Sequence, residues 1–238
     1  MIWIVFFLLI ILVSSVLAYR SMKDYEEIPD ALTLNALFYV SSPSNIDKAL
    51  STLHRKFSGQ KFFSLERLVK EDERAIVLFA ERGMKKDFEE LGLVEIEDYL
   101  ASGDGLSRHE KQTTVDETIS WLLDPKTDSK SLLQVKDEFR DLKVESGQKV
   151  FFQMVLMPTG DSQFQSTLRV MVADPDPVGR VQLAKDVDLL ISNSVGLRKH
   201  VDGFSESKKF ESFKQRTLVP KEVSEFYLSQ EEIISLLG

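Results

Sequence analysis

The sequence predicts an α+β protein in which an N-terminal transmembrane helix precedes two tandem βαββαβ units. Two observations lead to this prediction. Residues 2–18 form one uncharged apolar run, and every charged residue of the chain follows it. In the rest of the chain, short runs of apolar or alternating residues are separated by stretches whose apolar residues recur every three or four positions. The first pattern is typical of strands and the second of helices, and their succession occurs twice.

The N-terminal run is long enough to cross a membrane. A helix rises about 1.5 Å per residue, so residues 1–19 just span a hydrocarbon core of roughly 30 Å. We therefore expect residues 1–19 to be a transmembrane anchor that contacts lipid through residues 2–18. The aromatic side chains of this anchor are Trp3, Phe6 and Phe7.

The flanks of the run predict its orientation. Arg20 and Lys23 follow it, no basic side chain precedes it, and basic residues tend to remain in the cytoplasm. We therefore expect a single-pass membrane protein whose body lies in the cytoplasm. The alternative is a signal peptide cleaved near Ala18, because Val16-Leu17-Ala18 resembles a small-x-small cleavage site. The basic segment that normally opens a signal peptide is missing.

The composition excludes several classes of protein. The chain has no cysteine, which excludes disulfides, thiolate zinc sites and cysteine nucleophiles. Its formal net charge of −8 argues against a general nucleic-acid-binding surface, which would need a basic face. We therefore expect no direct contact with nucleic acid.

The first predicted unit covers residues 34–100, after a polar linker at residues 20–33. Its element order is strand, helix, strand, strand, helix, strand, which is the split βαβ or ferredoxin-like arrangement. Gly92 is expected to end the second helix. The predicted elements are a strand at 34–40, a helix opening at Ser44, strands at 63–69 and 75–80, a helix at 85–91 and a strand at 93–99.

The second predicted unit covers residues 111–238, after a linker at residues 101–110. The same order of elements recurs, although the two units show no residue-level similarity. Asp176-Pro177 predicts a helix start, and Ser229 with Glu232 predicts a capping box for a final helix. The other predicted elements are a weak strand at 111–119, a helix at 128–143, strands at 149–157, 164–173 and 218–228, and a loop at 195–215.

The sequence contains no recognisable catalytic motif. It lacks a phosphate-binding loop, a dinucleotide-binding glycine pattern, a zinc-protease helix and a nucleophile elbow. Asp174 and Asp176 could hold a divalent cation, but a turn and a helix cap explain both. We therefore expect no catalytic residue, metal or cofactor, and not an enzyme. The three histidines, which lack metal-ligand spacing, are His54, His109 and His200.

Four elements of the second unit recur together in a known family. They are Asp124-Pro125, Gln148-Lys-Val-Phe-Phe-Gln-Met-Val-Leu-Met-Pro158, Asn193 followed by Gly203-Phe204, and Phe226-Tyr-Leu-Ser-Gln-Glu-Glu-Ile-Ile-Ser-Leu-Leu237. Through them residues 120–238 resemble the membrane-associated N-terminal region of type IV secretion or conjugation motor ATPases, and the first unit does so more loosely. In that family the last element precedes the motor domain, whereas this sequence stops at Gly238. No catalytic residue of the family therefore has a counterpart here.

The resemblance implies a membrane-tethered, non-catalytic adaptor that positions a separate motor ATPase or contacts a secretion channel. The chain would be a free-standing relative or a truncated motor protein, and it would bind either its motor or another copy of itself. We expect the partner to contact the 195–215 loop and the apolar end of the last helix, at Ile233, Ile234 and Leu237. The alternative is an extracytoplasmic binding or assembly protein that is exported and released.

Overall fold

The computed structural model of the chain describes residues 34–57, 61–71, 73–100, 113–126, 142–160, 162–201, 203–217 and 226–237. The fold below is that of the compact unit Asn35–Gly238. None of the helices in the described ranges has both the length and the apolar composition needed to cross a membrane. The predictions outside these ranges are the anchor with Trp3, Phe6 and Phe7, the flank with Arg20 and Lys23, the linkers 20–33 and 101–110, and most of helix 128–143 and of strand 218–228.

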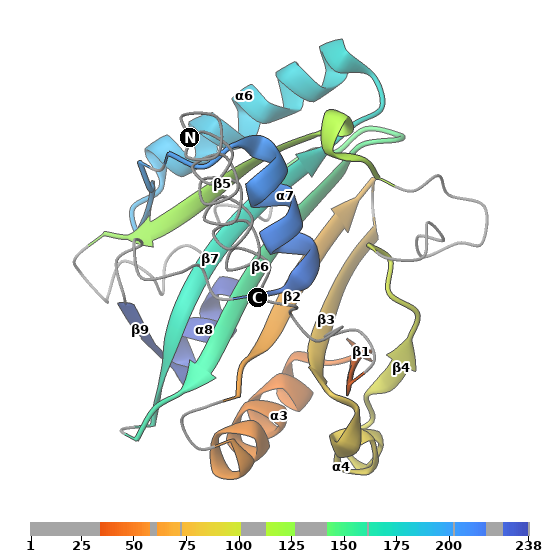
Figure 1. The fold of residues 1–238 in the computed structure, drawn as a ribbon, viewed down its shortest axis with the longest axis vertical. Helices are drawn as coiled ribbons and strands as arrows, with labels where there is room; N and C mark the ends of the chain where they lie inside the picture. Colours follow the sequence, from red (N-terminus) through yellow and green to blue (C-terminus); the bar gives the residue numbers. More distant parts are fainter. Residues whose placement is uncertain are drawn as a thin grey trace, which may run out of the picture. The chain divides into compact units, whose positions relative to one another are not determined.

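The described strands form one antiparallel sheet of nine strands (Figure 1). Their order is β4-β1-β3-β2-β6-β7-β5-β8, and β9 pairs with β7. With the helices described next, this sheet confirms the predicted α+β class. The strands are β1 (Asn35–Val40), β2 (Phe63–Lys70), β3 (Glu73–Glu81), β4 (Val94–Ile96), β5 (Thr118–Pro125), β6 (Lys149–Pro158), β7 (Gln163–Ala173), β8 (Leu197–Lys199) and β9 (Phe226–Ser229).

Helices lie on both faces of this sheet, with α7 in front of the strands and α8 behind them in Figure 1. The main apolar core lies on the α8 face, where α3, α4, α6 and α8 pack against alternate residues of the strands, such as Phe63 and Leu65. We call the opposite side the α7 face. The helices are α3 (Pro43–Lys56), α4 (Lys85–Glu90), α6 (Pro177–Asn193), α7 (Glu206–Gln215) and α8 (Gln230–Leu237).

The sheet consists of two halves with the same strand arrangement. The first four strands of the chain take the order β4-β1-β3-β2, and the next four take the order β6-β7-β5-β8. Each half therefore places its first strand between its third and fourth, and its second strand at the seam. We expected two tandem units, each with its own sheet, whereas β2 and β6 pair antiparallel and join all the described strands into one sheet. This pairing satisfies the backbone groups that each strand would otherwise leave open as an edge.

Several local predictions are confirmed. Helix α6 begins after Asp176, whose Oδ2 accepts a 2.8 Å hydrogen bond from the Gly179 amide. The Ser229 amide donates to the Glu232 carboxylate at 2.7 Å, and the Glu232 amide donates to Ser229 Oγ at 3.3 Å, as a capping box at the start of α8 requires. Gly92, with φ of +78°, follows α4 in the left-handed conformation that suits glycine.

Three predictions of element position are wrong. The weak strand at 111–119 is instead a 3₁₀ turn at Val115–Glu117, closed by a capping box from Thr114, and the strand begins only at Thr118. Leu142 and Lys143, expected to end a helix, are not helical. The 195–215 segment is not a loop, because it forms β8 and α7; Ser205 caps α7, and Phe210 and Phe213 bury its inner side.

Candidate functional site

A row of polar side chains crosses the seam of the sheet on the α7 face. Glu66 of β2 lies opposite Gln153 of β6, and Gln153 lies opposite Arg169 of β7. Their exposed fractions are 0%, 0% and 2%. Buried polar groups of this kind need internal partners, because they have lost their hydrogen bonds to water.

Glu66 accepts hydrogen bonds from both halves of the sheet and from the segment that follows α7. Its Oε1 accepts from Ser64 Oγ at 2.7 Å, from Gln153 Nε2 at 3.0 Å and from Arg216 Nε at 2.7 Å. Its Oε2 is buried and has no partner in the part of the chain that the structure describes. One carboxylate therefore connects β2, β6 and the end of α7.

Arg216 closes α7 and inserts its guanidinium between two carboxylates. The residue is fully buried and has φ of +55°, a conformation that is unfavourable for a side chain of this size. Its two terminal nitrogens donate to the two oxygens of Asp98 at 2.9 and 3.0 Å, and its guanidinium lies 4.7 Å from the centre of the Phe79 ring. Burial alone would lower the pKa of Arg216, but Glu66 and Asp98 outweigh it and raise the pKa.

Arg169 connects the sheet to the backbone of α7. Its Nη1 donates to Gln153 Oε1 at 2.9 Å and to the Ser212 carbonyl at 2.7 Å, and its Nη2 donates to the Thr217 carbonyl. Gln153 Nε2 adds a 3.0 Å bond to the Phe213 carbonyl. Burial lowers the pKa of Arg169 to about 9, which leaves the side chain cationic at neutral pH.

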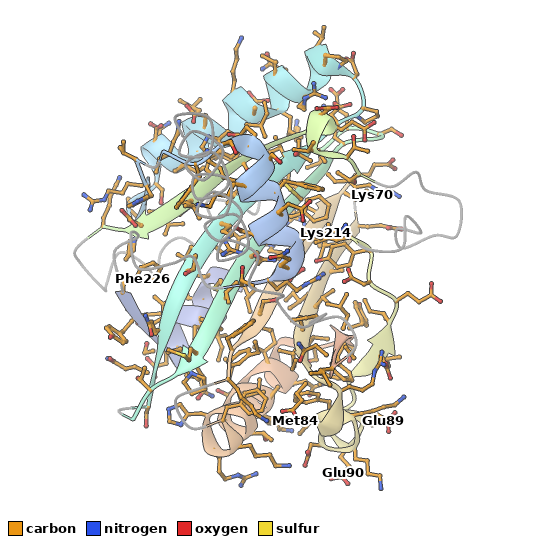
Figure 2. All side chains as sticks on the ribbon, in the orientation of Figure 1. Lys70, Met84, Glu89, Glu90, Lys214 and Phe226 are labelled. Carbon is orange, nitrogen blue, oxygen red and sulfur yellow. The ribbon has the colours of Figure 1, made fainter. Side chains whose placement is uncertain are left out.

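These contacts form a charge-balanced cluster of Glu66, Asp98, Arg169 and Arg216, which we call the seam cluster. Its two guanidiniums neutralise its two carboxylates, and they donate to those carboxylates and to backbone carbonyls in or just after α7. The arrangement is suited to fixing α7 on the sheet. Lys214, whose carbonyl accepts a 3.1 Å bond from Arg216, is labelled in Figure 2.

A cavity of about 400 Å³ adjoins this cluster at one end of the sheet. Tyr99 forms part of its wall, and the Tyr99 ring lies 5.6 Å from the Arg216 guanidinium. Lys70, which Figure 2 shows at the end of β2, is one of its polar lining residues. A second gap, between α7 and Trp121 of β5, holds only about 20 Å³, which is room for one water molecule.

The residues predicted to contact a partner do not form an exposed surface. Ile233 and Leu237 are 0% and 1% exposed and belong to the main core, and Ile234 packs partly against it. Helix α8 packs against α3 and β9, and its apolar side chains are part of the main core. The sequence pattern correctly predicted that α8 is amphipathic, but it did not indicate that the apolar side of α8 would be covered by the rest of the fold.

The candidate metal and histidine positions have ordinary structural partners. Asp174 accepts from the Asp176 amide at 2.8 Å and from Gln148 Nε2 at 3.0 Å, as a turn before a helix requires. His54 Nε2 lies 2.9 Å from the Thr159 carbonyl, and His200 Nδ1 lies 3.0 Å from Asp124. Within the described ranges, no three histidine or acidic side chains gather as a metal site would require. His109 lies outside those ranges.

Helix α6 carries apolar side chains on its outer side as well as its inner side. Leu183, Ala184, Val187 and Ile191 are buried against the sheet. Val178, Val181 and Leu189 are instead 77%, 47% and 61% exposed. Spacings of three and eleven residues place these three on one side of a helix, where the exposed Lys185 lies between Val181 and Leu189; we call the three apolar residues the α6 stripe.

Sequence reasoning missed the seam cluster, although one signal was available. Gln153 interrupts β6, whose residues 150–157 are otherwise apolar on both faces, and Glu66 occupies the centre of a neighbouring strand, β2, beside Leu65. A polar residue in such a strand indicates a buried partner, but the partner is up to 150 positions away in the chain.

No protein-family model matches the chain, and no curated protein matches it either.

Proposed function

We propose that the chain is a membrane-anchored, non-catalytic interaction module of a type IV secretion or conjugation-like machine, and that it positions a separate motor ATPase. Three features support the proposal. Residues 2–18 are apolar enough to anchor the chain in lipid. Residues 120–238 resemble the non-motor region of such ATPases. The described part of the body offers an exposed apolar surface, the α6 stripe, to a protein partner.

We also propose that the body is a pair of ferredoxin-like units that share one sheet. The mirrored strand orders on either side of β2 and β6 support this interpretation. In each half the first strand lies between the third and the fourth, as a split βαβ arrangement requires. A sheet of this width, with its two halves joined by the seam cluster, would give a partner a rigid platform.

The observation that best supports the function is the α6 stripe. Two valines and a leucine on one side of a surface helix cost free energy in water, and groups of exposed apolar residues often mark protein contacts. The proposed occupant is the motor ATPase, because the resemblance places a motor beside this region of the chain. The stripe replaces the end of α8 as the expected contact, since the apolar side chains of α8 are committed to the core.

A pull-down of the full chain with its cognate motor tests the proposal. Val178→Glu with Val181→Glu should weaken motor binding at least tenfold and leave the circular dichroism spectrum unchanged. Lys48→Glu is the matched control, because it makes the same change in net charge at an exposed site on α3. Motor binding by the double variant at the wild-type level would contradict the docking surface. ATP turnover by the chain above a mock preparation would contradict a non-catalytic role.

The location of the body is tested separately. A reporter fused after Gly238 should be active in the cytoplasm, because Arg20 and Lys23 favour that side for the flank after the anchor. A mature chain that begins at Tyr19, detected by mass spectrometry of the native N-terminus, would instead favour the exported alternative.

A further inference from the structure

We propose that the two outer edges of the sheet bind each other in different copies of this chain, so that β8 of one copy pairs with β4 of the next. The proposal goes beyond the adaptor function and does not depend on it. Strands β4 and β8 end the strand order β4-β1-β3-β2-β6-β7-β5-β8. An edge strand presents backbone amides and carbonyls with which another strand can pair.

Both edges are open to solvent. Val94 of β4 is 60% exposed, and the side chain of Arg198 in β8 is 62% exposed. Among the described strands, β4 pairs with β1 alone and β8 pairs with β5 alone. One side of each strand is therefore available to a further strand.

The directions of the strands suit a contact between the two different edges. Each neighbouring pair along the strand order is antiparallel, so β4 and β8, the first and the eighth strand, run in opposite directions. A second copy in the same orientation therefore places its β4 antiparallel to β8 and keeps its helices on the same faces. Because the contact joins two different surfaces, it repeats from copy to copy and gives a ring if it closes or a filament if it does not.

The two edges carry side chains of opposite charge. Strand β8 contains Arg198 and Lys199, whereas Glu95 lies in β4 and Glu97 follows directly after it. Like charges oppose the pairing of β4 with β4, or of β8 with β8, and opposite charges favour the pairing of β4 with β8. The charges therefore favour a head-to-tail contact with a second copy.

Two of these four charges already have partners inside the chain. Glu95 forms ion pairs with Lys85 and Arg82, and Lys199 forms one with Asp188. The attraction between copies therefore depends mainly on the other two charges.

Glu97 and Arg198 remain available for a contact between copies. Glu97 is exposed and has no ion pair within the part of the chain that the structure describes. Arg198 Nε lies 3.9 Å from the Asp124 carboxylate, which is too long for a hydrogen bond. An exposed ion pair between copies adds little affinity, but it determines which edges meet.

The faces of the side chains select a register for the contact, because directly opposite residues of an antiparallel pair share a face. Arg198 and Ile96 both lie on the α7 face, since their partners in β5 and β1 alternate with the core residues Leu123 and Phe38. Pairing Arg198 with Ile96 brings Glu97 within one position of Arg198 across the contact. The same register places the other two charges directly opposite each other.

Cross-linking through introduced cysteines tests the contact, since the chain has no cysteine of its own. Val94→Cys and Val201→Cys place one thiol beside each edge, at side chains that are 60% and 95% exposed. The full chain in detergent micelles, at roughly 0.1 mM to populate a weak contact, is treated with a short bismaleimide and separated on a denaturing gel. The chain with both cysteines should give a ladder of dimers, trimers and larger species. Each single variant should give no more dimer than Lys48→Cys, an exposed site on α3 that measures random collisions.

Charge reversal in the double-cysteine chain tests the pair of charges. Arg198→Glu or Glu97→Lys should each lower the yield of the ladder about fivefold, because a weak attraction becomes a repulsion, and the two changes together should restore it. Thermal melts show that each variant is folded. The contact would be refuted by the absence of a ladder, by an equal yield through Val94→Cys alone, which would indicate pairing of β4 with β4, or by a folded double reversal that does not recover the ladder.

Discussion

Replacing Glu66 by glutamine should destabilise the body strongly, because it leaves a net positive charge in a dry part of the structure. In the wild-type chain two carboxylates balance two guanidiniums, and Glu66 Oε1 accepts three hydrogen bonds. Removing one partner of a buried ion pair costs about 3–5 kcal/mol. For a folded unit of this size, 1 kcal/mol shifts the melting temperature by roughly 2–4 °C, so we expect a fall of about 10 °C.

The measurement is a thermal melt of the full chain followed by circular dichroism. Glu97→Gln is the matched control, since it removes an exposed carboxylate on the segment that leads to Asp98, and it should stay within about 0.5 kcal/mol of the wild type. Adding Arg169→Met to Glu66→Gln restores charge balance, so the double variant should recover at least about 1 kcal/mol relative to the sum of the single changes. A Glu66→Gln chain that melts with the wild type, or strictly additive effects, would show that charge balance does not govern this cluster.

Three further changes test other parts of the structure. Arg169→Asp should unfold the sheet at least as readily as Leu168→Asp in thermal melts, because it turns a neutral buried cluster into one with two excess negative charges. Tyr99→Phe should raise the free energy of unfolding by about 1 kcal/mol in denaturant titrations, because it removes a buried hydroxyl that has no hydrogen-bond partner within the described residues; lower stability would show that the hydroxyl has a partner. Ser229→Ala should lower that free energy by about 1 kcal/mol through loss of the α8 cap, and an unchanged denaturation midpoint would contradict the capping role.

The parts of the fold that the sequence predicted are those specified by neighbouring residues. Helix α6 is recognisable from Asp176-Pro177, and α8 from Ser229 and Glu232, because each cap acts within one helical turn. Strand β7 is recognisable from its alternation between Phe164 and Ala173. The strand order and the shared sheet could not be predicted in this way. They depend on the pairing of β2 with β6, which joins residues about ninety positions apart and leaves no pattern among neighbouring residues.

Alternation along β7 assigns Arg169 to the face opposite Leu168 without indicating what covers that face. With no covering element in view, a charged side chain on that face would be expected in solvent, whereas Arg169 is buried. The covering helix, α7, was itself missed, since Phe210 and Phe213 are its only buried apolar residues in a lysine-rich segment. Without that helix the candidate site could not be predicted, because Arg216 and the carbonyl partners of Arg169 all come from the last turn of α7 or just beyond it.

The position of the seam cluster suggests why charged groups are kept where apolar ones would pack. On the core face, Phe63, Leu65 and Val69 of β2 lie opposite apolar residues of β6, so a slip of two residues between the strands would still place mostly apolar side chains opposite one another there. The same slip would separate Glu66 from Gln153 and leave Arg216 without its second carboxylate. A buried charge without its partner costs several kcal/mol, far more than a small loss of packing. We therefore infer that the cluster selects the register in which the two halves form one sheet, and α7 can dock only when that register is correct.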